Sequence, residues 1–84
     1  MFYVYILKSE KDGTHYIGYT SKEPKERLRE HNLGRNRYTK GHRPYKLLTY
    51  KGVDTKKEAK GLERYLKRLK DIKRAIEMIK GSPD

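Results

Sequence analysis

Two short tyrosine-rich apolar segments near the N-terminus constrain the fold most strongly. They are residues 3–7 (Tyr-Val-Tyr-Ile-Leu) and residues 16–19 (Tyr-Ile-Gly-Tyr), with an Asp-Gly pair between them. Each segment is rich in aromatic and β-branched residues and is bounded by turn-forming residues, which is the pattern of a β-strand. The two segments therefore predict a β-hairpin.

The register of this hairpin decides whether its tyrosines can act together. The first strand is expected over residues 2–8, with apolar side chains on both faces, as in a strand that is covered on both sides. If the Asp-Gly pair forms a two-residue turn, Tyr16 lies opposite Ser9 and shares a face with Tyr5. A slip of one residue would put the two tyrosines on opposite faces.

The middle of the chain predicts a helix, a loop and a third strand. Residues 20–24 combine hydroxyl groups, an acid and a proline, which favours a helix start, and the helix is expected to run to about Leu33 before Gly34. Residues 34–46 contain two glycines, a proline and no acid, and they predict a basic loop. Residues 45–52 read as a strand that ends at a glycine.

The C-terminal third predicts two helices. Residues 55–58 (Thr-Lys-Lys-Glu) form a capping box, and Asp71 can cap or kink the chain before a second helix. The apolar stripe of the first helix is Ala59, Leu62, Leu66 and Leu69, and that of the second is Ile72, Ala75, Ile76 and Ile79. Gly81 and Pro83 are expected to end the second helix. The chain is expected to form one domain over residues 1–84, in the order strand, strand, helix, strand, helix, helix.

The net charge of +11 is the strongest compositional signal. It is concentrated in residues 21–53, where ten Lys or Arg stand against three Glu. Such a field favours a polyanionic partner, either nucleic acid or an anionic membrane face. The plainer alternative is solubility, because a high content of Lys and Glu is also typical of heat-tolerant proteins.

Several classes of protein are disfavoured by what the chain lacks. It has no cysteine for disulfides or thiolate metal sites, no apolar run of the ~20 residues that a membrane span needs, and no signal-peptide pattern at its start. We therefore expect a soluble cytoplasmic protein without a membrane segment.

Glu63 is the most informative acid. It borders the apolar stripe of its helix, where an unpaired carboxylate would be costly to bury. The simpler, structural interpretation is an ion pair with Lys67 four residues later. The alternative is a carboxylate that holds a hard cation such as Mg²⁺.

Arg27 and His31 lie four residues apart and should project from one helix face. Arg27 could belong to a surface network with Glu23 and Glu30, or it could clamp a phosphate through its guanidinium. His31 could be a packing imidazole, the commoner case for a lone histidine, or a proton carrier.

The basic loop is the candidate nucleic-acid contact. An aromatic ring among cations could stack on a base while the cations meet phosphates, and a flexible solvated loop is the alternative. The candidate residues are Arg35, Arg37, Tyr38, Lys40, Arg43 and Lys46.

The order of these features resembles the GIY-YIG nuclease domain, in particular its small stand-alone members. Residues 3–5 (Tyr-Val-Tyr) match the first signature and residues 16–18 (Tyr-Ile-Gly) match the second. Arg27 and His31 match an R-x-x-x-H spacing, and Glu63 matches the acid of the later helix. The resemblance covers nearly the whole chain.

The resemblance implies a fold of the α/β (α+β) class, a three-stranded antiparallel sheet flanked by helices, with the active site on one sheet face. It implies hydrolysis of nucleic-acid phosphodiesters with one divalent metal, Mg²⁺ or Mn²⁺. Glu63 would bind the metal and Arg27 would steady the phosphate. Tyr5 and Tyr16 would orient or deprotonate the attacking water, and His31 would assist proton movement or bond a tyrosine. A phenol has an unperturbed pKa of about 10, so cationic neighbours or the metal would have to lower it.

The chain departs from the family pattern in two ways. Tyr3 replaces the glycine of the first signature, and the asparagine that some members carry in the final helix is missing, since Asn32 and Asn36 come too early. No DNA-targeting domain is expected either, so a partner protein could supply specificity.

Three functions remain open from the sequence. The leading hypothesis is a metal-dependent endonuclease or nickase that acts on DNA rather than RNA, with branched or damaged structures in repair or recombination as candidate substrates. A non-catalytic nucleic-acid-binding module that uses the same basic surface is the alternative, and a protein-interaction adaptor is a weaker third.

Overall fold

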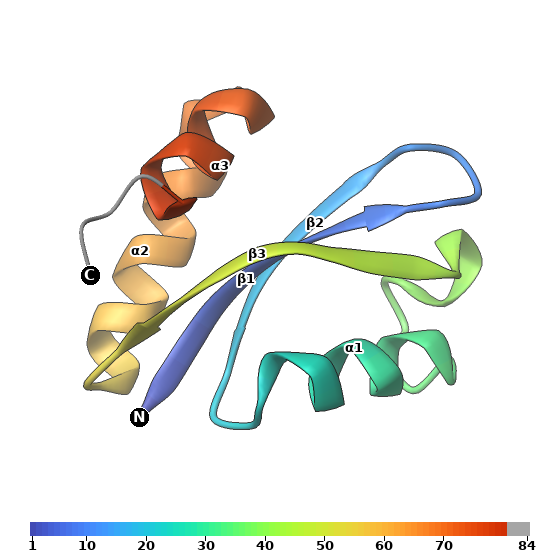
Figure 1. Cartoon of the computed structure of the whole chain (residues 1–84), viewed down its shortest axis with the longest axis horizontal. Coiled ribbons are helices and arrows are strands. Elements are labelled where there is room, and N and C mark those ends of the chain that lie inside the picture. The colour runs from blue at the N-terminus through green and yellow to red at the C-terminus, as the bar shows by residue number, and fades with distance from the viewer. Residues whose placement is uncertain (81–84) are drawn as a thin grey trace.

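A computed structural model describes residues 1–80 and shows a three-stranded antiparallel sheet with helices on both faces (Figure 1). The strands are β1 (Phe2–Ser9), β2 (His15–Thr20) and β3 (Tyr45–Val53), and β1 lies between the other two. The helices are α1 (Pro24–Asn32), α2 (Lys56–Leu69) and α3 (Ile72–Lys80), with a short 3₁₀ turn at Lys40–His42. The expected fold class and element order are confirmed.

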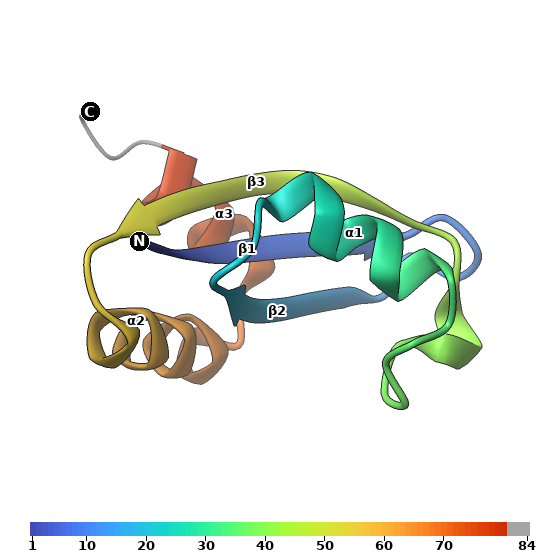
Figure 2. The ribbon, with the colours of Figure 1, turned by 90° about the horizontal axis from the view of Figure 1, so that it is seen from below.

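The central strand β1 is apolar on both faces because each face supports a separate core. Val4 and Ile6 are fully buried against α2 and α3, together with Ala59 and Leu66. Tyr5, Leu7 and Tyr45 form the core under α1, with Leu28 of α1 packed against them. In Figure 2, α1 crosses in front of the sheet, α3 lies behind it, and α2 runs alongside β2 at the sheet edge.

The hairpin register differs from the expected one by two residues. Tyr16 pairs with Leu7 and not with Ser9. The connection is longer than a two-residue turn because the Ser9 hydroxyl accepts hydrogen bonds from two backbone N–H groups of the loop, and Gly13 takes a left-handed φ of 77°. A shift by an even number keeps Tyr16 on the face of Tyr5, as expected.

The start of α1 also differs from its expected form. Its N-cap residue is Glu23, which makes no side-chain capping bond, although Pro24 occupies the first turn. The Thr20 hydroxyl instead accepts from the Lys22 backbone N–H. The helix ends at Asn32 with Leu33 as its C-cap, close to the expected end.

The two C-terminal helices are capped as their sequence predicts. Thr55 caps α2 by accepting from the Glu58 backbone N–H at 3.1 Å. Asp71 caps α3 by accepting from the Arg74 backbone N–H at 3.2 Å. The expected end of this helix at Gly81 and Pro83 lies outside the described residues. Within residues 1–80, no helix is long and apolar enough to cross a bilayer.

Candidate active site

Tyr5 and Tyr16 come together on the face of the sheet that α1 covers. Their ring centroids lie 6.2 Å apart. Tyr5 is buried at 1% exposure, whereas Tyr16 is half-buried. Tyr16 also lines a pocket of about 420 Å³ between β2 and the α2–α3 corner, and Lys67 is part of the same lining. Tyr16 is therefore the more exposed of the two tyrosines.

Gly18 makes the close approach of the two phenols possible. It pairs with Tyr5 across the hairpin and lies two residues from Tyr16 on the same strand, so all three positions share one face. A Cβ at Gly18 would lie 2.7 Å from the Tyr5 hydroxyl oxygen and 2.8 Å from Tyr16 Cε2. Gly18 was matched only as part of the second signature, without a packing role, although a glycine inside a strand often marks a close approach.

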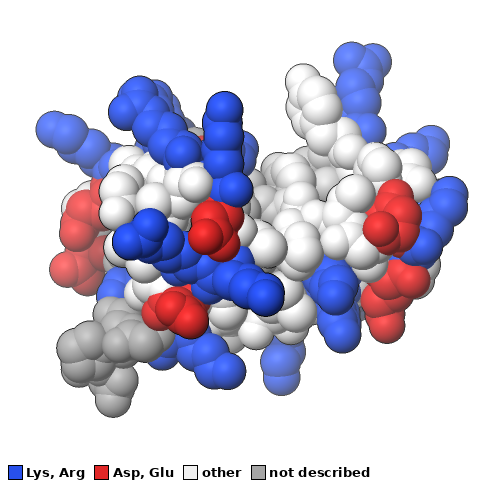
Figure 3. Space-filling model, turned by 90° about the horizontal axis from the view of Figure 1, so that it is seen from above, with Lys and Arg blue, Asp and Glu red and all other residues white. Residues whose placement is uncertain are grey.

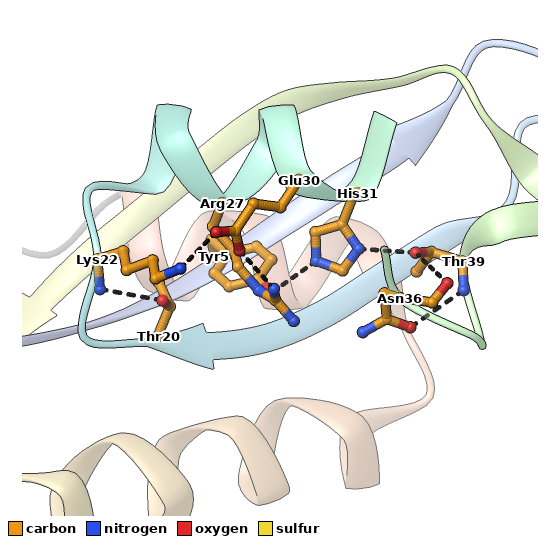
Figure 4. A network of polar contacts seen from close by, with 8 residues as sticks. All are labelled: Tyr5, Thr20, Lys22, Arg27, Glu30, His31, Asn36 and Thr39. Carbon is orange, nitrogen blue, oxygen red and sulfur yellow. Dashed lines mark hydrogen bonds and ion pairs between the residues drawn. The ribbon is translucent and has the colours of Figure 1, made fainter. Parts of the chain in front are cut away.

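His31 anchors the tyrosine pair from α1. Its side chain is fully buried, and its ring centroid lies 5.0 Å from that of Tyr16. Figure 4 shows its two nitrogens engaged on opposite sides: Nε2 lies 2.9 Å from the Tyr5 hydroxyl and Nδ1 lies 2.7 Å from Thr39 Oγ1. Thr39 is itself buried, and no sequence signal pointed to it. The helix and the basic loop are thus tied to β1 through one imidazole.

Burial shifts the pKa values of His31 and Tyr5 in opposite directions. Desolvation, with a contribution from the Arg27 charge, lowers the pKa of His31 to about 4, so the imidazole is neutral at pH 7. Desolvation also raises the pKa of Tyr5 to about 12, although its hydrogen bond with Arg27 opposes the shift. The pKa of Tyr5 is therefore raised, whereas a general base at neutral pH would need a lowered pKa.

The buried neutral His31 makes the stability of the fold depend on pH. Its pKa is about 6.5 in the unfolded chain and about 4 in the folded chain, so between these values the unfolded state binds more protons and stability falls as the pH falls. From pH 7 to pH 5 this loss should be about 2 kcal/mol. Urea unfolding of wild type and His31→Gln at both pH values measures it. A variant that loses as much stability as wild type would contradict the assignment.

Arg27 lies beside the Tyr5 hydroxyl and is held by Glu30. Its Nη1 donates to Glu30 Oε1 at 2.7 Å, and its hydrogen bond with Tyr5 helps to raise its own pKa. Glu30 also pairs with Lys22, and these two cations lower the pKa of Glu30 to about 2. The surface network expected for Arg27 therefore exists, but Lys22 takes the place of Glu23.

Glu63 approaches the same cluster from α2. Its side chain is 21% exposed, and its Oε2 lies 3.6 Å from Lys67 Nζ. The ion pair with Lys67 that the simpler interpretation predicted is therefore present. This pair is weak, because Lys67 is 53% exposed and such pairs contribute only a few tenths of a kcal/mol. The negative charge of Glu63 is nevertheless close enough to Tyr5 to raise its pKa. Glu63 on α2 is therefore near enough to Tyr5 for its charge to act on the phenol.

The acids and histidines of this region fit a cation that is held by very few protein ligands. Within residues 1–80, no group of three or more His, Asp or Glu side chains could hold a metal ion. Glu63 supplies one carboxylate. Mg²⁺ commonly binds proteins through one or two carboxylates, retains several waters and takes further oxygens from a substrate phosphate. A single carboxylate such as that of Glu63 thus fits a hard cation of the Mg²⁺ type that takes its other ligands from water and substrate.

The basic loop is exposed but held by specific hydrogen bonds. Tyr38 is 81% exposed. The Asn36 side chain accepts from the Tyr38 and Thr39 backbone N–H groups, and His42 Nδ1 lies 2.6 Å from Asp12 Oδ2 of the hairpin. The cations of the loop and of the following strand are also exposed: Arg35, Arg37, Lys40, Arg43 and Lys46. The loop is thus an exposed cationic surface, and nucleic-acid binding by these residues stays a prediction.

One face of the molecule carries an uncharged hollow between two groups of cations (Figure 3). On the face shown in Figure 3, Lys and Arg side chains gather at both ends, and an uncharged hollow separates them in the upper half of the view.

The structure also gives Asn32 a role that was not predicted from the sequence. Its side chain accepts from the Tyr45 N–H and donates to the Tyr45 carbonyl, which ties α1 to β3.

This fold, with two tyrosines, an arginine, a histidine and one acid around a sheet edge, defines a GIY-YIG-type domain. The family model of the GIY-YIG catalytic domain matches residues 1–74, and the chain belongs to this family, a superfamily of nucleases. Domains of the family act on nucleic acid and generally use a divalent metal.

Among curated proteins, the chain is similar to small proteins named only as UPF0213. One from Clostridium perfringens is 43% identical over 70 residues, which cover 82% of this chain and 73% of the relative. One from Streptococcus pneumoniae is 42% identical over 69 residues, which cover 81% and 68%. One from Halobacterium salinarum is 39% identical over 70 residues, which cover 82% and 88%. No solved structure gives a significant match.

Proposed function

We propose that this protein is a metal-dependent endonuclease or nickase that hydrolyses phosphodiester bonds in DNA. The observation that carries the proposal is that Tyr16 and Arg27 lie against the buried Tyr5, and that the charge of Glu63 acts on the same tyrosine. The site draws on β1, β2, α1 and α2, so we propose that the chain works as one domain. A cytoplasmic location, a DNA rather than an RNA substrate, a role in repair and a partner that supplies specificity are parts of the same proposal.

In this proposal Arg27 steadies the scissile phosphate. A guanidinium carries five N–H donors, and Glu30 and Tyr5 engage only some of them. Lys22 also pairs with Glu30, so Glu30 orients the Arg27 guanidinium without offsetting all of its positive charge. The phosphate would therefore meet a guanidinium that is both oriented and cationic. A planar donor set of this kind matches phosphate oxygens.

Tyr16, rather than Tyr5, orients the attacking water. Tyr5 is buried and its pKa of about 12 makes it a poor base at neutral pH. Tyr16 is only half-buried, and its ring contacts both Tyr5 and His31. Tyr5 then acts as a positioning residue that fixes Tyr16 on one side and Arg27 on the other.

The hydrogen-bond chain through His31 fixes the direction in which the Tyr5 hydroxyl donates its proton. Thr39 Oγ1 lies 3.5 Å from the Asn36 carbonyl, which can only accept. When the Thr39 proton points there, His31 Nδ1–H donates to Thr39 and Nε2 accepts the Tyr5 proton. The Tyr5 oxygen is then free to accept from Arg27, so every group in the chain is satisfied.

Glu63 is the residue that would hold the metal ion. A bound Mg²⁺ or Mn²⁺ supplies Lewis-acid stabilisation of the charge that develops on phosphate oxygens. The 3.6 Å contact with Lys67 is longer than a hydrogen bond, so little is lost when the carboxylate turns to a cation.

The purified protein is expected to nick at least one DNA when Mg²⁺ or Mn²⁺ is present and none when EDTA is present. The panel contains supercoiled, branched and single-stranded DNA, with an RNA duplex as the test of substrate class. Cleavage of RNA alone would overturn the choice of DNA, and no cleavage of any substrate would overturn the nuclease proposal.

The second candidate is a nucleic-acid-binding module without useful catalysis. The raised pKa of Tyr5 favours it, because a buried neutral phenol can be purely structural. This module would bind the same panel with a strong dependence on salt and would cleave nothing. A protein-interaction adaptor would show neither property.

A further inference from the structure

The exposed face of α2 carries a basic groove that lies outside the site described above. The groove is a hollow of about 540 Å³ lined by Lys56, Lys57, Lys60, Gly61 and Arg64. Four of these five residues are cationic and none is acidic. Within residues 1–80, no ion pair engages the four cations. A ligand of this groove must therefore be anionic.

The cations lie in a row along the helix and do not surround a single point. Lys56, Lys60 and Arg64 succeed one another at intervals of four residues, which places them on one helix face at steps of about 6 Å along the axis. A single phosphate ion would leave most of the row unused. An extended polyanion with repeated charges matches it.

Gly61, in the middle of the row, has no folding reason to be glycine. It lies inside a helix, where glycine is less favourable than alanine. A Cβ at Gly61 would meet no atom within 4 Å, in contrast to Gly18, where the two phenols fill the space. A glycine in the floor of a cationic groove permits a close approach of something that the chain itself does not supply.

The position of Glu63 on the same helix relates the groove to the candidate active site. Glu63 precedes Arg64 and lies between the buried face of α2 and the basic row. A strand that passes Glu63 would meet the row within one helical turn. An anionic membrane face, the other polyanion that the net charge allows, would not need to pass Glu63.

We propose that the α2 groove binds the phosphodiester backbone of duplex DNA beside the cleavage site. This inference rests on the proposed function, because it takes DNA as the substrate. The groove would fix the duplex on α2 and present the next phosphate to Glu63 and Arg27. It makes contacts that the basic loop, on the other side of the molecule, does not make.

Binding is measured by fluorescence anisotropy with a labelled 20-base-pair DNA duplex in EDTA, over a series of salt concentrations. In the double variant Lys60→Gln/Arg64→Gln, the slope of log affinity against log salt is expected to fall by about 2, with a corresponding loss of affinity. The matched control is Lys73→Gln/Arg74→Gln on α3, which removes the same charge from exposed positions. The control is expected to keep a slope close to that of wild type.

Gly61→Ala separates a binding role from a structural one. Alanine should raise the Tm of the folded domain by about 4 °C, because it favours the helix. It should weaken duplex binding several-fold, because its methyl group occupies the floor of the groove. A merely structural glycine would show the first effect without the second.

Three results would overturn the proposal. They are a Lys60→Gln/Arg64→Gln variant that binds duplex like the α3 control, a Gly61→Ala variant that binds like wild type, and a groove that is required for phosphatidylserine vesicles but not for DNA. A failure of catalysis is interpreted separately from a failure of binding. A protein that binds DNA through the groove but cleaves nothing would contradict only the nuclease proposal.

Discussion

Glu63→Gln is expected to lower the rate of metal-dependent DNA cleavage about 10³-fold or more. Glutamine keeps the size of the side chain but removes the charge that would hold the cation. Only a weak exposed ion pair with Lys67 is lost, so the free energy of unfolding should change by about 0.5 kcal/mol or less. DNA affinity in EDTA should stay the same or increase, because a negative charge beside the phosphate path has been removed.

The matched control for this variant is Glu77→Gln on α3, which neutralises a helical acid at an exposed position. It should cleave at the wild-type rate. If both variants cleave like wild type, Glu63 does not hold the metal. If both lose activity equally, the effect follows net charge and not the site.

Gly18→Ala has the second large expected effect, and it acts on both the fold and the site. The added methyl would lie within 3 Å of the Tyr5 hydroxyl and of the Tyr16 ring, so one of the two phenols must move. Such overpacking of a buried site costs about 1–3 kcal/mol, a fall in Tm on the order of 5–20 °C. Cleavage should be lost even at temperatures where the variant remains folded, because Tyr16 no longer holds its place.

Gly41→Ala provides the control for the same chemical change. Gly41 lies in the 3₁₀ turn, and a Cβ there meets nothing within 4 Å. Thermal unfolding and cleavage are compared for both variants. A Gly18→Ala protein that melts and cleaves like Gly41→Ala would show that the close packing of the two phenols is not needed.

The sequence predicted the fold well because local signals agreed with one another. The apolar segment of β1, with side chains for both faces, required a central strand. The capping residues Thr55 and Asp71 placed the two C-terminal helices correctly. The hairpin register was wrong by two residues because the Ser9 hydroxyl captures the loop backbone, a local bond that competes with a tight turn.

The site was only partly readable, since its chemistry depends on burial and on contacts between distant segments. Motif spacing pointed to Tyr5, Tyr16 and Arg27, which do converge. Nothing in the sequence showed that His31 would be fully buried against Thr39, because the pair belongs to two elements that meet only in the folded chain. The pKa of Tyr5 is likewise a property of its buried position.

The most direct test of the central claim is a single-turnover cleavage assay with Mg²⁺. Wild type, Glu63→Gln and Arg27→Ala are purified in parallel and given the DNA that the substrate panel selects, with EDTA as the blank. Wild type is expected to cleave only with metal, and both variants are expected to bind the DNA but to cleave it at least about 100-fold more slowly. Equal cleavage by all three proteins, or no cleavage by wild type with either Mg²⁺ or Mn²⁺, would contradict the central claim.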